Sequence, residues 1–109
     1  MAREKVRMAM DANGQPIQGA LCPRRNGSQN VVVGAASAVS TELVSAEVVR
    51  LAATTDCRIR FGDFVAVAAV ATDMLLHGGF PEYFNLRNYK YIAVIQDTAG
   101  GILNIQIMD

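Results

Sequence analysis

The chain has 109 residues, of which 51% are hydrophobic and 18% are charged, and ten basic and ten acidic residues give a formal net charge of zero. This length favours a single domain, and the high apolar content argues against a disordered chain. A neutral chain lacks the basic surface that nucleic acid or an anionic membrane attracts, so neither partner is expected. The charged fraction is low for a free monomer, which indicates that a partner, or further copies of the chain, cover part of the surface.

The first thirty residues differ from the rest because they contain few large apolar side chains. Alternation over residues 6–10 predicts a short strand, residues 15–21 predict a weaker one, and residues 23–28 predict a loop. We therefore interpret residues 1–30 as an N-terminal arm, either a peripheral hairpin or an extended tail that becomes ordered against a neighbour, and residues 31–109 as a β-sandwich domain. The charged N-terminus lacks the apolar run of a signal peptide.

Short strands are next predicted over residues 29–33, 47–53, 57–61 and 82–86. The clearest is the third, in which Cys57, Ile59 and Phe61 alternate with two arginines, so its cysteine is expected to be buried. Residues 34–40 are small and indicate a linker or loop. Residues 64–74 mix helix formers with strand formers, and we interpret them as a loop that carries a short strand or a helical turn.

Residues 89–108 are the stretch around which the predicted fold is organised. Two runs rich in β-branched and aromatic residues flank a loop with a double glycine, which predicts a hairpin. In the second run Leu103, Ile105 and Ile107 alternate with polar residues, so one face is apolar. About seven short strands, spaced by roughly ten residues, predict an all-β fold, either a small β-sandwich or a jelly-roll-like barrel.

No chemical motif accompanies these elements. His77 is the only histidine, and although Asp73 lies four residues before it, the sequence Gly-Gly-Phe-Pro that follows predicts a turn rather than a helix. Cys22 and Cys57 have no metal-type spacing, and the sequence leaves open whether they pair. We expect no enzymatic activity, cofactor or metal. A cluster of His77, Cys57 and Asp73 in one cleft would instead favour an enzyme.

The candidate contact residues are basic and lie in three segments of the chain. They are Arg3, Lys5 and Arg7 on alternate positions of the first run, Arg24 and Arg25 in the predicted loop, and Arg58 and Arg60 on the polar face of a predicted strand. One interpretation is contact with an acidic protein surface or another subunit, and the other is a solvated face.

A family resemblance appears in the order of several motifs. They are Val49–Gly62 with its Ala-Thr-Thr-Asp-Cys sequence, Asp73-Met74-Leu75-Leu76, Phe80-Pro81-Glu82-Tyr83-Phe84, Tyr91-Ile92-Ala93-Val94-Ile95-Gln96 and Gly101-Ile102-Leu103-Asn104-Ile105. This order resembles small virion-associated proteins of tailed bacteriophages and prophages, and Gly14–Gln18 is also similar to their starts. His77 stands where those proteins often have a proline, a departure that falls in a loop.

The resemblance implies a structural protein of a phage particle, most often a capsid decoration or cement protein on the outer capsid surface. Its partners would be the major capsid protein and further copies of itself, as a trimer or dimer, and it would be made in the cytoplasm of the bacterial host. Many weak contacts, repeated over the shell, would oppose the pressure of packed DNA. The alternatives are a head-to-tail connector, tail or fibre-base component and, further, a small β-barrel ligand-binding module or enzyme.

Overall fold

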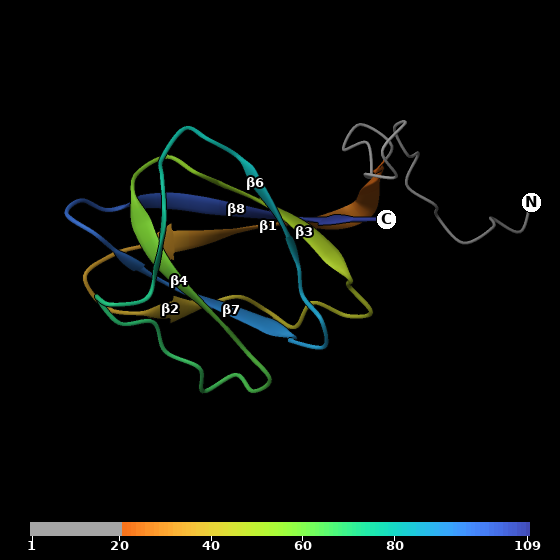
Figure 1. Cartoon of the computed structure of the whole chain (residues 1–109), viewed down its shortest axis with the longest axis horizontal. Coiled ribbons are helices and arrows are strands. Elements are labelled where there is room, and N and C mark those ends of the chain that lie inside the picture. The colour runs from red at the N-terminus through yellow and green to blue at the C-terminus, as the bar shows by residue number, and fades with distance from the viewer. Residues whose placement is uncertain (1–20) are drawn as a thin grey trace, which may run out of the picture.

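The computed structural model describes residues 21–109, which form two facing four-stranded antiparallel sheets (Figure 1). The strands are β1 (Pro23–Val33), β2 (Ala38–Val39), β3 (Val48–Ala53), β4 (Cys57–Gly62), β5 (Met74–Leu76), β6 (Glu82–Asn85), β7 (Tyr91–Gln96) and β8 (Gly101–Met108). The first sheet has the order β1-β8-β3-β6, and the second has the order β2-β7-β4-β5. The predicted all-β sandwich is confirmed.

The strands pair in a nested order along the chain. β1 pairs with β8, β2 with β7, β3 with β6 and β4 with β5. Folded into two facing sheets, this nested pairing is the eight-stranded jelly roll. Only β4 and β5 are both consecutive in the chain and hydrogen-bonded to each other, so every other connection between described strands crosses from one sheet to the other.

The core lies between the sheets and is filled by alternate residues of the strands. This alternation is the period of two that the sequence shows, because successive side chains of a strand point to opposite faces. Buried residues on the inner faces of three central strands are Val49, Leu51, Cys57, Ile59, Leu103, Ile105 and Ile107. Their burial supplies the main favourable term in the stability of a small sandwich.

The hairpin predicted over residues 89–108 is wrong in its pairing. Both of its strands exist, but β7 belongs to the second sheet and β8 to the first. Ile92 and Val94 on β7 are fully buried, as are Leu103 and Ile105 on β8. The connecting loop carries the chain across the core, so these apolar faces pack against each other instead of lying side by side in one sheet.

Residues 23–28, predicted as a loop, form the first half of β1. The strand is irregular here, because its register on β8 shifts between Pro23 and Ser28, and Asn26 has a left-handed φ of 60°. This bulge accommodates a turn-like Asn-Gly sequence inside a strand. The described part of the predicted arm therefore contributes to the first sheet. Residues 1–20, which include most of two predicted strands, lie outside the described residues.

Two short edge strands and one loop complete the second sheet. β2 interrupts the predicted linker at residues 34–40, and β5 was not predicted. Residues 63–73 form the β4–β5 loop, which contains two turns and runs over the outer face of this sheet. Its Ala69 N–H donates to Ser37 Oγ, next to β2, at 2.8 Å, and Ala93 on the outer face of β7 is fully buried. Figure 1 shows the loop as the green trace below β2 and β7.

Candidate functional site

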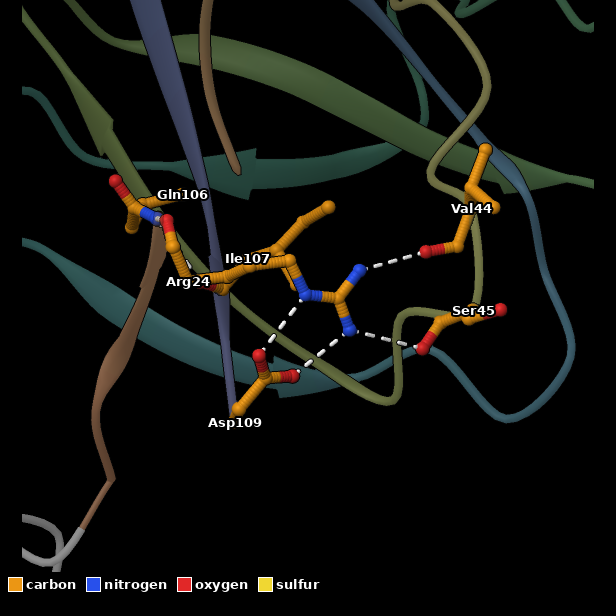
Figure 2. A network of polar contacts seen from close by, with 6 residues as sticks. All are labelled: Arg24, Val44, Ser45, Gln106, Ile107 and Asp109. Atoms are coloured by element: carbon orange, nitrogen blue, oxygen red, sulfur yellow. Dashed lines mark hydrogen bonds and ion pairs between the residues drawn. The ribbon is translucent and has the colours of Figure 1, made fainter. Parts of the chain in front are cut away.

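Arg24 joins three segments of the chain through a network of polar contacts (Figure 2). Its Nε and Nη2 donate to the two carboxylate oxygens of Asp109 at 2.9 and 2.8 Å. Nη1 donates to the carbonyl of Val44 at 2.7 Å, and Nη2 donates to that of Ser45 at 3.1 Å. The hydrogen bonds that Arg24 donates to the Asp109 carboxylate raise the pKa of the guanidinium. The guanidinium therefore ties β1 to the residue after β8 and to the β2–β3 loop.

Arg58 and Arg60 occupy the outer face of the second sheet, as their alternation with buried residues predicted. Arg58 forms an ion pair with Asp97 in the β7–β8 loop, with Nη2 3.2 Å from Oδ1. Arg60 forms one with Asp73 at the end of the β4–β5 loop, with a distance of 2.9 Å. Both guanidinium groups thus fasten loops to β4, and their predicted role in contacts with a partner stays a prediction.

Asp73 holds the end of the β4–β5 loop with both carboxylate oxygens. Oδ2 accepts a hydrogen bond from the backbone N–H of Val70 at 2.8 Å. Oδ1 accepts hydrogen bonds from Nε and Nη2 of Arg60 at 3.1 and 2.9 Å. These groups favour the ionised carboxylate, and they lower the pKa of Asp73, with the Val70 hydrogen bond as the largest cause. The loop is therefore fixed to the sheet by a charged group.

Of the other predicted contact residues, the structure describes only Arg25. Arg25 is exposed and has no ion-pair partner among residues 21–109. Arg3, Lys5 and Arg7 lie outside the described residues. Of the basic candidates that the structure describes, Arg25 alone therefore has a charge that no carboxylate among residues 21–109 neutralises.

The three residues whose clustering would favour an enzyme do not share a cleft. Cys57 is fully buried in the core, and its burial, with a smaller effect of Asp56, raises the pKa of the thiol to about 11. Asp73 binds Arg60 on the outer face, at the opposite end of β5 from His77. His77 is exposed, with Nδ1 3.9 Å from Oδ1 of Asp56. No disulfide joins Cys22 to Cys57, which answers the question of pairing that the sequence left open.

The β4–β5 loop exposes a surface that the sequence did not single out as a site. Phe64 is 77% exposed, Val65 is 63% exposed and Val70 is 42% exposed. Residues 64–72 contain no charged side chain, and this uncharged segment does not alternate as a half-buried strand does. A long uncharged run in a predicted loop is the signal that could have identified it.

Other large apolar side chains are exposed elsewhere on the described surface. Val32 and Ile102 are cross-strand neighbours on the outer face of the first sheet. Phe80 is exposed in the β5–β6 loop, beside the turn that follows β3, and Val44 is exposed at the opposite end of the sandwich, near Arg24. Of these, only Val32 and Ile102 are shown to be adjacent, and adjacent exposed apolar side chains mark contacts with other molecules more often than single ones do.

Two shallow depressions lie at the Val44 end of the sandwich. One, of about 330 Å³, is lined by Ala46, Glu47, Asn85, Arg87 and Asn88. The other, of about 240 Å³, lies between the bulge of β1 at Gly27 and the β2–β3 loop at Val44. Binding pockets for small molecules are predominantly apolar with a few convergent polar groups. The lining of the first depression is mostly polar, and the lining of the second is mixed.

In the part of the chain that the structure describes, no three His, Cys, Asp or Glu residues are grouped so that they could hold a metal ion. Residues 21–109 also contain no helix that could span a bilayer. Comparisons with protein-family models, with curated proteins and with solved structures find no match to this chain.

Proposed function

We propose that this chain is a structural protein of a bacteriophage particle, where it decorates the outer capsid surface and stabilises the head. The proposal starts from the motif order between Val49 and Ile105, which resembles virion-associated phage proteins. The jelly roll supports it, because many viral capsid domains have this architecture, although lectin domains and cupins have it too.

The distribution of exposed apolar side chains is the observation that carries the proposal. They lie on the outer face of the first sheet at Val32, outside the second sheet at Phe64, and at the two ends of the sandwich at Phe80 and Val44. A module that binds one ligand needs one such surface. A protein fixed in a lattice has neighbours on several sides, so several surfaces are expected.

The charges support contacts at the end of the sandwich where residues 1–20 join β1. Arg24 is used internally there, whereas the adjacent Arg25 is exposed without a described partner. We propose that Arg25 and residues 1–20 contact the major capsid protein. An extended arm adds contacts without needing a core of its own, and repetition over the shell multiplies their effect.

The test is binding of the purified chain to phage particles that lack it, with bound copies located and counted by electron cryomicroscopy. Decoration predicts density across the whole shell at lattice axes. For the Arg25→Glu variant, half-occupancy of the binding sites on the particle should require a protein concentration about tenfold higher than for wild type. The introduced carboxylate would be repelled by the acidic surface that we expect on the capsid protein. Arg87→Glu is the control, since Arg87 is also exposed and has no ion pair among the described residues.

Other outcomes would move or overturn the proposal. Density at one vertex or along the tail would replace decoration by a connector, tail or fibre-base role. Absence of any binding would overturn the virion proposal and return attention to a ligand-binding module or enzyme.

A further inference from the structure

We infer that the β4–β5 loop is the contact surface of a symmetric dimer, in which the uncharged segment 64–72 of one copy packs against the same segment of a second copy. This inference goes beyond the proposed function, because it concerns the purified chain and does not require a particle.

Internal hydrogen bonds and contacts with the second sheet fix the backbone of the β4–β5 loop. The N–H of Val67 donates to the carbonyl of Phe64 at 3.1 Å, and the N–H of Asp73 donates to that of Val70 at 3.0 Å, which closes two turns. Ala69 is anchored to Ser37, and Asp73 to Arg60. Exposed apolar side chains on a fixed backbone lose little conformational entropy when a partner covers them.

The packing of the loop on β4 fixes it further. A Cβ added at Gly62 would lie 2.6 Å from Cβ of Val67, so Val67 occupies the space that a side chain at Gly62 would need. Val67 thereby seats the loop on the sheet, while Phe64, Val65 and Val70 point outward. Different side chains therefore form the exposed surface of the loop and its contact with β4.

The absence of charge in segment 64–72 points to a second copy as the partner. In a contact with two-fold symmetry each residue near the axis meets its own counterpart, so a charged residue there would face a charge of the same sign. Segment 64–72 avoids this repulsion. Of the two aspartates that flank it, Asp73 is neutralised by Arg60 of the same chain, whereas Asp63 is exposed. The zero net charge of the chain removes long-range repulsion between copies.

Symmetry also favours this contact over one between different surfaces of two copies. The apolar pair Val32 and Ile102 lies on the outer face of the first sheet, and the β4–β5 loop covers the outer face of the second. A contact between these opposite faces would join different surfaces, so it would add copies into a ring or an open chain. A contact of the loop with itself closes at two copies.

The size of the surface sets the expected strength. The exposed parts of Phe64, Val65 and Val70 offer on the order of 300 Å² of apolar surface. A stable complex buries roughly 800 Å² on each partner. We therefore expect a weak dimer, with a Kd of tens to hundreds of micromolar. Copies held close together on a surface would reach that concentration locally.

Sedimentation equilibrium from about 1 µM to about 1 mM tests the inference on the full chain. Wild type should show a monomer–dimer equilibrium. Val65→Asp and Val65→Lys should each raise the Kd at least about tenfold, because each puts like charges across the axis. An equimolar mixture of the two variants should dimerise again. Phe80→Ser, which changes an exposed phenylalanine away from this loop, should keep the wild-type Kd.

Several results would overturn the inference. A wild-type chain that stays monomeric up to about 1 mM would do so, as would Val65 variants that dimerise as wild type does. Failure of the mixture to recover would show that the loop meets a different surface. If wild type is monomeric and Val65→Asp weakens binding to particles, the capsid protein covers the loop, and the virion proposal stands without this dimer. If deletion of residues 1–20 is required before dimers form, those residues cover the loop in the full chain.

Discussion

Ile105 lies on β8, between β1 and β3, and is fully buried. Ile105→Ala would leave a cavity between the two sheets, and hydrogen bonds on both sides of the strand limit its collapse. We expect a loss of about 2–5 kcal/mol in the free energy of unfolding, measured by urea denaturation. Ile102→Ala, on the opposite face of the same strand, should cost less than about 1 kcal/mol. A cost below about 0.5 kcal/mol for Ile105→Ala would contradict its burial.

Single residues also show which part of the candidate site the sequence could predict. The alternation around Cys57 indicated its burial correctly, because neighbours two residues apart share a face of a strand. The partner of Arg24 could not be predicted, because Asp109 lies 85 residues further along the chain. The same holds for Arg58 and Asp97, 39 residues apart, since such ion pairs depend on the register of strands from distant segments.

At the scale of elements, the sequence predicted most strands but not their partners. Leu103 and Ile105 alternate with polar residues in the same way whether β8 pairs with β7 or faces it across the core. Periodicity therefore identifies the buried face of a strand and leaves its sheet undetermined. β5 has only three residues, too few to show a period, and Asn26 and Gly27 favoured a turn that exists as a bulge within β1.

Close packing of the connections at one end of the sandwich allows a test at this scale. A Cβ added at Gly78 would lie 2.8 Å from Cα of Thr55, and the Gly78 N–H donates to Asp56 at 2.7 Å. Gly78→Ala should therefore lower the free energy of unfolding by about 1–3 kcal/mol, measured by urea denaturation. At Gly34 an added Cβ would have no neighbour within 4 Å, so Gly34→Ala should change the free energy of unfolding by no more than about 0.5 kcal/mol. Equal effects would show that the β5–β6 connection moves freely.

The anchoring of the β4–β5 loop by Asp73 should depend on pH. The Val70 N–H and Arg60 lower the pKa of Asp73 in the folded state, so its contribution to stability is present above the unfolded pKa of about 3.9. That contribution is lost as the pH falls through the folded pKa. The Tm difference between wild type and Asp73→Asn should be constant near neutral pH and shrink below about pH 4.

A second variant separates the two causes of this dependence. Arg60→Gln removes the ion pair but leaves the Val70 hydrogen bond, which is the larger cause of the lowered pKa. It should reduce the pH-dependent part of the Tm by less than Asp73→Asn does. A Tm difference for Asp73→Asn that does not change with pH would show that the carboxylate contributes no charge-dependent stability to the loop.

For the whole molecule, the nested pairing makes the first and last described strands neighbours. β1 covers one edge of β8, and Arg24 on β1 holds Asp109 and the β2–β3 loop. An arm defined by composition as residues 1–30 therefore includes eight residues, 23–30, that complete the first sheet. Composition could not show this, because residues 23–30 are mostly polar and β1 is an edge strand whose outer face is open to water.

Two truncations test whether the folded domain begins near residue 21 or near residue 31. Deletion of residues 1–20 leaves β1 complete, so we expect a folded domain whose free energy of unfolding is within about 1 kcal/mol of wild type, with weaker binding to particles. Deletion of residues 1–30 removes Arg24 and leaves only Val31–Val33 of β1, so most of the edge of β8 in the first sheet loses its partner strand. This shorter chain should lose its cooperative thermal transition, followed by circular dichroism. Unfolding of the first truncation would place residues 1–20 in the core, whereas a stable second truncation would show that β8 and β3 suffice to hold the sheet without β1.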